Sequence, residues 1–412
     1  MPTDTDTLGP PRTSIGILGW LKKNLFSTWT NTLLTLVSVW AIYSAGERFL
    51  VWALTTARWG VITTNLRLFM VGPFPPEQVW RVWLCIAMAS FLFGFSGGVW
   101  RGTVRTLAIG LAATYAVLIL LPLEANTRIW HAVNLGVMLA GFVPGYLAER
   151  LPENRRSGLQ PWLLVAWLVA FVITLVLLQG FKEFPGLPKD IKNPLPEIGS
   201  NLWGGLLLTF MLALVSTIVS FPLGVLLALG RRSRLPAVSI FSTVYIELVR
   251  GVPLVTILYM AQIMVPLFLP GQMRIANVVR VIVGMTLFTA AYLAENVRGG
   301  LQAIPPGQIE AAQALGLGNA LVTLLIVLPQ ALRLVIPANV GLFISLFKDT
   351  TLAVIVGLLE VLSIGRSVLA QPEWLGRQTE VYLFIAAIFF VFSYVMSYAS
   401  YKLEAALGVG KR

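Results

Sequence analysis

The chain has 412 residues, of which 57% are hydrophobic and 12% are charged, with a formal net charge of +12. Because soluble domains carry about 25% charged residues, this composition excludes an ordinary soluble fold and predicts an integral membrane protein. The Lys and Arg residues come in twos and threes between apolar runs and lack the interleaved aromatics of nucleic-acid sites, so the charge indicates membrane topology. We therefore expect membrane lipid, and no nucleic acid, among the partners.

Residues 1–181 contain about five apolar runs that are long enough to be membrane helices. A hydrocarbon layer about 30 Å thick requires about 20 apolar residues per helix, and backbone groups in lipid must pair within the segment, which favours helices. Two of the runs are short and interrupted by glycine, so the number could be lower. The polar N-terminal stretch, with Lys22 and Lys23, indicates an inner-side anchor rather than a cleavable signal peptide. The predicted spans are 31–57, 82–97, 106–121, 132–147 and 161–181.

A polar, proline-rich stretch at 182–199 separates this part from the rest of the chain. Its four prolines stand among Lys, Asp and Glu residues, and proline removes a backbone donor and breaks helices, so the stretch cannot be a helix. We expect a periplasmic linker here. The prolines are Pro185, Pro188, Pro194 and Pro196.

Residues 200–412 contain five more predicted spans. Prolines within or beside these spans free carbonyl groups and bend the helices, which suits a gated pathway. The sequence therefore predicts an all-α, polytopic membrane protein whose five-helix core is preceded by about five extra N-terminal helices. The spans are 203–230, 238–269, 276–300, 332–359 and 381–403, and the prolines are Pro222, Pro253, Pro266 and Pro337.

Clusters of basic residues fall on one side of the membrane if every predicted span crosses. Cytoplasmic loops are enriched in Lys and Arg, so this side is expected to be the cytoplasm. The bias is modest, because other basic residues fall on the opposite side. The clusters are Lys22 and Lys23; Arg150, Arg155 and Arg156; Arg231, Arg232 and Arg234; and Lys411 and Arg412.

A short segment of small residues lies between the third and fourth core spans, at 305–330. Pro305 and Pro306 are expected to end the preceding span, and Pro306 suits the first turn of a new helix. Glu310 is then expected in an early turn, where the positive end of the helix dipole favours a carboxylate. The alanines beside it have almost no bulk, so a partner surface could approach the backbone closely. They are Ala311, Ala312 and Ala314.

The second half of this segment predicts a turn followed by another helix. Gly316 and Gly318 permit the turn, and Asn319 is expected to cap the next helix. An apolar face supplied by Ile309, Leu315 and Leu317 suits a helix that lies in a groove of another protein. An interfacial amphipathic helix without a partner is the alternative, which the weak hydrophobicity of alanine disfavours.

The pattern E-A-A, three residues, G, nine residues, I, one residue, L-P resembles the cytoplasmic coupling loop of ABC importer permeases. The resemblance implies that this loop transmits the work of a separate pair of ATP-binding cassette subunits. The chain has no G-x-x-x-x-G-K-[ST] loop, so it is expected to bind no nucleotide and not to be an enzyme itself. The matching residues are Glu310, Ala311, Ala312, Gly316, Ile326, Leu328 and Pro329.

Three further stretches, 245–254, 291–305 and 347–352, resemble the polar amino-acid branch of these permeases, and 24–36 is similar to the longer permease of general L-amino-acid importers. The resemblance implies a multi-pass subunit of the bacterial inner membrane that moves L-amino acids by alternating access. It also implies a second permease subunit and a periplasmic amino-acid-binding protein as partners. Asn296 departs from the family pattern, which usually has a β-branched residue there, and this leaves the substrate range open.

Polar residues within the core spans are the candidates for the substrate pathway, because intramembrane charges are costly and tend to face a partner or a water-filled path. Asp349 with Thr350 and Thr351 suits the ammonium and carboxylate groups of a zwitterion. A purely structural polar bridge is the alternative. The other candidates are Gln262, Glu295 and Glu247.

The remaining candidates have structural interpretations that need no substrate. Glu247 and Glu295 each have an arginine three residues later, so pairs along one helix face, Glu247 with Arg250 and Glu295 with Arg298, explain both. Gln262 suits a hydrogen bond between helices equally well.

Two other functional classes fit the composition less well. A stand-alone secondary transporter or channel is expected to show internal repeats, and we find none between the two halves. A membrane enzyme is disfavoured by the absence of a convergent acid–base pair. With one cysteine, Cys85, and one histidine, His131, a Cys/His metal site is excluded, and we expect no cofactor. Residues 1–198 could also act as a scaffold alone.

Overall fold

The computed structural model describes residues 16–183, 193–268 and 275–408. All the named secondary-structure elements in these ranges are helices. The chain divides after Val61 into two compact units. Within the described ranges, nine helices are long and apolar enough to cross a membrane, and the bent pair α10–α11 would make a tenth. The prediction of an all-α, polytopic membrane protein is confirmed.

The first unit contains α1 (Gly16–Asn24) and the long helix α2 (Trp29–Val51), which ends in a wide π-helical turn, η2 (Trp52–Thr56). Thr28 starts α2, because its Oγ1 accepts a hydrogen bond at 3.2 Å from the backbone N–H of Asn31. None of the residues of α2 is buried within this unit. The predicted span 31–57 is confirmed.

The second unit begins with a set of helices that confirm the other four N-terminal spans. The glycines that made two of these spans doubtful do not shorten them, and most of them pack against a neighbouring helix. A short element, α3 (Gly60–Thr64), lies across the boundary between the units. It is followed by α4 (Leu66–Val71), η3 (Pro76–Gln78), α5 (Trp80–Val99), α6 (Thr103–Leu120), α7 (Ala125–Glu149) and α8 (Glu153–Gln179).

Glycines hold α5 and α7 at close range. Each helix carries two of them four residues apart, Gly94 and Gly98 on α5 and Gly141 and Gly145 on α7. A Cβ at Gly94 would lie 2.0 Å from the carbonyl oxygen of Met138, and one at Gly98 would lie 2.6 Å from the backbone of Gly145. Small residues allow membrane helices to approach in this way, so that packing and not hydrophobicity joins them.

A leucine at Gly94 is expected to destabilise the protein more than a leucine at Gly110. The obstacle at Gly94 is backbone, which cannot rotate away, whereas a Cβ at Gly110 on α6 would meet nothing within 4 Å. Overpacking of this kind costs about 1–3 kcal/mol or more. Thermal unfolding of the detergent-purified variants measures the difference. Equal melting temperatures for the two variants would show that the α5–α7 contact does not limit stability.

The described part of the linker is anchored by a buried arginine. Arg81, near the start of α5, is fully buried, and its guanidinium donates hydrogen bonds to the carbonyl oxygens of Pro196 at 3.0 Å and Leu177 at 3.3 Å. Residues 193–199 are not helical, as their prolines predict, whereas Pro185 and Pro188 lie outside the described residues. The division into 1–181, 182–199 and 200–412 stays a prediction.

The second unit has a core to which both halves of the sequence contribute. Phe74, Val82 and Leu178 belong to the same buried cluster as Leu208 and Met285. The backbones also meet directly, because a Cβ at Gly72 would lie 2.4 Å from the Cα of Gly204. Helices α5 and α8 are therefore packed into the same core as the C-terminal helices and do not merely surround it.

The remaining elements of the second unit follow the predicted core spans, with one correction. The span predicted at 238–269 is wrong as a single helix. It consists of α10 (Pro236–Gly251) and α11 (Leu254–Leu267), whose axes differ by 111°. The break falls where Val252 is extended before Pro253, because proline pushes the residue before it out of the helical region. The other long helices are α9 (Gly205–Arg231), α12 (Asn277–Gln302), α15 (Leu328–Asp349) and α17 (Gln378–Leu407).

The span predicted at 332–359 also changes character before its end. After Asp349 the chain tightens into a 3₁₀ helix, η6 (Thr350–Val356), and turns at Gly357, whose φ is +79°. Helix α16 (Val361–Leu369) then begins at the fully buried Glu360, whose carboxylate accepts hydrogen bonds at 2.8 Å from the backbone N–H groups of Leu362 and Ser363. Burial raises the pKa of this carboxyl group, and these hydrogen bonds oppose the rise. The remaining short 3₁₀ turns are η4 (Ser200–Leu202) and η7 (Pro372–Trp374).

Candidate coupling element and charged cluster

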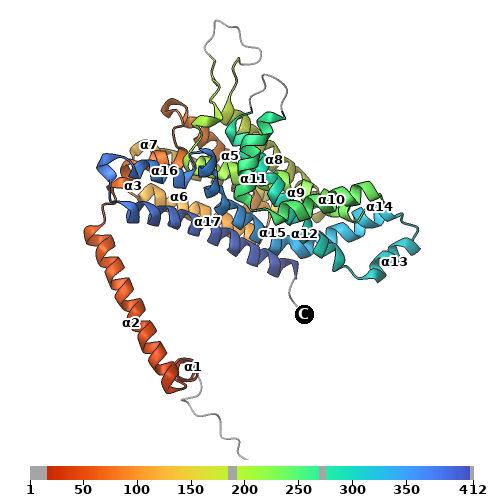
Figure 1. Cartoon of the computed structure of the whole chain (residues 1–412), viewed down its shortest axis with the longest axis horizontal. Coiled ribbons are helices and arrows are strands. Elements are labelled where there is room, and N and C mark those ends of the chain that lie inside the picture. Colours follow the sequence, from red (N-terminus) through yellow and green to blue (C-terminus); the bar gives the residue numbers. More distant parts are fainter. Residues whose placement is uncertain (1–15, 184–192, 269–274, 409–412) are drawn as a thin grey trace, which may run out of the picture. The chain divides into compact units, whose positions relative to one another are not determined.

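The coupling element consists of α13 (Pro306–Ala314), α14 (Asn319–Leu321) and the wide turn η5 (Val322–Val327), which leads into α15. Figure 1 shows α13 and α14 at one extremity of the second unit. Helix α12 ends at Gln302, Pro305 is extended, and Pro306 is the first residue of α13. The predicted break and restart at the two prolines are confirmed, and they follow from the missing N–H and the fixed φ of proline.

A glycine turn ends α13. The φ of Gly316 is +83°, its N–H donates to the carbonyl of Gln313 at 2.9 Å, and the N–H of Leu317 donates to that of Ala312 at 3.2 Å. This pair of bonds is the Schellman arrangement, which satisfies the last carbonyls of a helix and needs a left-handed residue. The glycine turn predicted at this position is therefore confirmed at Gly316.

Two details predicted for this segment, one in the turn and one in α13, are wrong. Asn319 does not cap α14, because Gly318 precedes that helix and Asn319 is its first residue. The Oδ1 of Asn319 instead accepts a hydrogen bond from Nε2 of Gln313 at 3.0 Å, which ties the two arms of the turn together. Glu310 is the fifth residue of α13 and lies beyond its first turn, so it does not interact with the N-terminal dipole. Its side chain is exposed.

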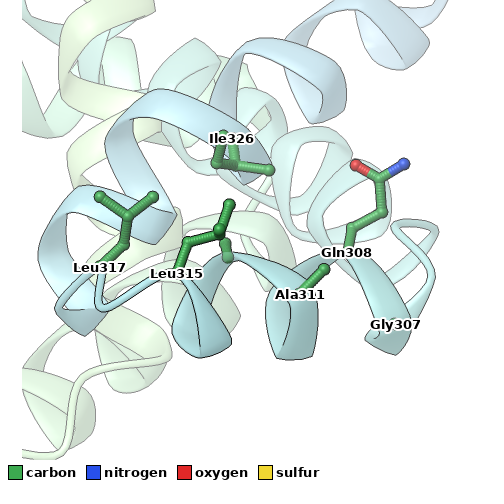
Figure 2. Close-up of a pocket in the computed structure, with 7 residues that line it drawn as sticks. Gly307, Gln308, Ala311, Leu315, Leu317 and Ile326 are labelled. Atoms are coloured by element: carbon green, nitrogen blue, oxygen red, sulfur yellow. The ribbon is translucent and has the colours of Figure 1, made fainter.

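An open apolar hollow of about 420 Å³ lies between α13 and η5. Figure 2 shows the side chains of Leu315, Leu317 and Ile326 around it. Leu315 is 84% exposed, whereas Ala312, which also lines the hollow, is buried among core residues. The hollow and the exposed Leu315 together offer apolar surface that another apolar group could cover. The lining residues are Gly307, Gln308, Ala311, Ala312, Leu315, Leu317 and Ile326.

The coupling element is fastened to α15. Nε2 of Gln330 donates a hydrogen bond at 2.9 Å to Oε1 of Gln308 on α13, and another at 2.9 Å to the carbonyl of Ile326. Pro329 is the second residue of α15, which directly follows the wide turn η5. These hydrogen bonds tie α13 and η5 to the start of α15.

Five charged side chains from three helices meet near the same end of the unit, and we call them the arginine–glutamate cluster. Glu295 on α12 contacts three arginines: Nε of Arg298 lies 2.9 Å from its Oε2, Nη1 of Arg231 3.3 Å and Nη1 of Arg250 3.8 Å. Nη2 of Arg231 also lies 2.8 Å from Oε1 of Glu247. The cluster joins the end of α9 to α10 and α12.

The cluster corrects one of the two predicted helix-face pairs. The pair Glu295–Arg298 is confirmed. The pair Glu247–Arg250 is wrong, because within the described residues Glu247 contacts Arg231 and Arg250 contacts Glu295. Arg231 on α9 and Glu295 on α12 lie closer to Glu247 and Arg250, respectively, than these two residues of α10 lie to each other.

The candidates around Asp349 lie at the opposite end of α15. The hydroxyls of Thr350 and Thr351 donate to the carbonyls of Phe347 at 2.7 Å and Lys348 at 2.9 Å, and so satisfy the end of the helix. Asp349 is partly buried, and no hydrogen bond or ion pair of its side chain is found within the described ranges. Gln262 lies on α11, where its backbone carbonyl accepts from Arg280 at 3.2 Å.

The long apolar helices define a multi-pass membrane protein, and the family match defines its class as a membrane-spanning transport subunit. A family model described as "Binding-protein-dependent transport system inner membrane component" matches residues 220–408. The chain is 36% identical over 408 residues to the "Inner membrane amino-acid ABC transporter permease protein YhdY" of Escherichia coli K12, with 98% of this chain and 97% of that protein covered.

A second relative is the "Glutamate/glutamine/aspartate/asparagine transport system permease protein BztC" of Rhodobacter capsulatus, 36% identical over 441 residues, with 98% of this chain and 97% of that protein covered. A solved "amino acid ABC transporter with histidines" is 28% identical over 49% of this chain and 92% of that chain, with a TM-score of 0.45. The chain belongs to the amino-acid ABC transporter permease family. It is a multi-pass protein of the inner membrane.

Proposed function

We propose that the chain is the membrane-spanning subunit of an importer that moves L-amino acids across the inner membrane by alternating access, with the coupling element as the part that receives the work of ATP. The coupling-element geometry carries this proposal. A short helix, set off by a proline break and a left-handed glycine, presents an open apolar hollow that holds the exposed Leu315. A groove-binding helix is a recurrent way for one protein to dock on another.

The ATPase activity belongs to a separate pair of subunits in this proposal. Ala311 lines the hollow without filling it, so that a partner side chain fits against the backbone of α13. Glu310 is exposed beside it and is free to meet a cation of the partner. The other proposed partners are a second permease subunit and a periplasmic amino-acid-binding protein, and the names of the relatives support the substrate class.

The contacts of α12 and α15 supply a route by which the coupling element acts on the membrane core. The two helices pack closely at Gly300, where a Cβ would lie 2.7 Å from the carbonyl oxygen of Ala331. Further along, Nδ2 of Asn296 donates to Oδ1 of Asn339 at 2.9 Å. Helices joined by backbone contact and a partly buried hydrogen bond would move together. Rocking of this body would open the substrate path on one side or the other.

The proposal is tested by reconstituting the chain, co-purified with its partners, into vesicles that contain ATP. We expect the vesicles to take up labelled L-amino acids when ATP is present and not when it is absent. The change Glu310→Lys should leave the protein in the membrane while uncoupling ATP hydrolysis from uptake, because it reverses the charge on the docking helix. Uptake that continues without ATP would instead support a secondary transporter, and unchanged coupling in Glu310→Lys would remove that residue from the interface.

A further inference from the structure

Arg280 is an arginine inside a candidate membrane span for which no ion pair is found within the described ranges. It is the fourth residue of α12, near the end opposite the coupling element. Its Nη1 donates to the backbone carbonyl of Gln262 on α11 at 3.2 Å. Its Nε is buried and has no hydrogen-bond partner, and the side-chain Oε1 of Gln262 is buried and unpartnered as well. Both groups retain unused hydrogen-bonding capacity at the junction of α11 and α12.

The position of these two groups is fixed by close packing of the helices. Gly284 lies one turn after Arg280, and a Cβ there would lie 3.3 Å from both Ala261 and Leu258 on α11. The side chains of Ala261 and Leu258 therefore pack against Gly284 and keep α11 close to α12 beside Gln262 and Arg280. Burying charged and amide groups without partners is costly. A ligand with complementary charges would relieve this cost.

We propose that Arg280 and Gln262 form a binding site for the α-carboxylate and α-ammonium groups of the transported amino acid. With Nη1 directed to the carbonyl of Gln262, the Nε and Nη2 edge of the guanidinium is left for two parallel hydrogen bonds to a carboxylate. The amide oxygen of Gln262 accepts from the ammonium group. This inference rests on the proposed function, because it assigns a recognition site on the path of its substrate.

Unused polar atoms on the same helices support a path along them. Within the described residues, eight buried side-chain nitrogen or oxygen atoms have no partner, and four of these belong to α10, α11 and α12. A lipid-facing or tightly packed helix set would not concentrate them, since each unpartnered group is destabilising in an apolar medium. The four are Nε of Arg250, Oε1 of Gln262, Nε of Arg280 and Oγ1 of Thr286.

The test measures binding of labelled L-glutamine, which the name of one relative includes among its substrates, to the complex of permeases and ATPases without the binding protein. L-glutamine amide, which lacks the α-carboxylate, is the competitor. We expect the wild type to prefer L-glutamine to the amide. The change Arg280→Gln should weaken L-glutamine binding about 10- to 100-fold, as for lost hydrogen bonds to a charged group, and should abolish the preference. Arg280→Lys, which keeps the charge but not the paired hydrogen bonds, should fall between them.

Arg128→Gln is the matched control, because Arg128 is also the fourth residue of a candidate span, α7, and its side chain is exposed. A lipid phosphate is the other anion that an arginine near the end of a membrane span attracts. An equal effect of Arg128→Gln, or unchanged affinity and preference in Arg280→Gln, would overturn the proposal. A wild-type complex that binds neither L-glutamine nor any other L-amino acid would also overturn the proposed site, whereas the proposed function fails only if the reconstituted complex shows no ATP-dependent uptake.

Discussion

Replacing Gly316 by alanine is expected to reduce ATP-driven uptake about tenfold while the protein still inserts into the membrane. The φ of Gly316 is +83°, and this conformation costs a residue with a Cβ about 1–2 kcal/mol. A Cβ at this position would meet nothing within 4 Å. The change therefore acts through the backbone alone, by shifting the direction in which α13 leaves the turn. Uptake and ATP hydrolysis measured in the same reconstituted vesicles show whether the two have become uncoupled.

Gly318 offers the matched control two residues later. A Cβ there also meets nothing within 4 Å, but the φ of Gly318 is −66°, which alanine adopts freely. Gly318→Ala should therefore leave uptake close to that of the wild type. If both variants lose uptake equally, the loss comes from added bulk on the docking surface. If neither does, the left-handed turn is not required for coupling.

The elements of this fold that the sequence predicts best are those that depend on local chemistry. The proline break before α13 and the left-handed glycine after it depend on residues that are adjacent in the chain, and both are found where they are expected. Long apolar runs likewise correspond to helices because lipid leaves the backbone no other partner. The sequence is misleading where a helix end depends on its surroundings, as at Val252 and Pro253, where the apolar run continues but the axis turns by 111°.

The contacts between distant residues could not be predicted from the sequence. Glu247 and Arg250 have the spacing of a helix-face pair, yet each finds a partner on another helix, because α9 and α12 bring Arg231 and Glu295 within reach. Arg280 gave no signal at all as a single arginine near the start of an apolar run. Its significance comes from the carbonyl of Gln262 and the unpartnered Nε, which only the packing of α11 on α12 places together.

Replacing Glu295 by glutamine is expected to destabilise the protein by about 1–3 kcal/mol, because three arginines would lose their shared carboxylate. Glu247 would then be the one carboxylate left in the cluster. Glu295 contacts Arg231, Arg250 and Arg298, and its side chain is 24% exposed. Partial exposure lowers the cost below that of a fully buried pair, since water screens the arginines that remain. Thermal unfolding of the purified protein in detergent measures the loss.

Glu247→Gln is the control within the same cluster, and it should cost less than about 1 kcal/mol, as for a surface ion pair. Glu247 is 56% exposed and contacts only Arg231 among the described residues. Raising the salt concentration should reduce the small effect of Glu247→Gln further, because exposed charges are screened most, while most of the effect of Glu295→Gln should persist. Equal effects of the two changes at low salt would show that Glu295 does not hold α9, α10 and α12 together.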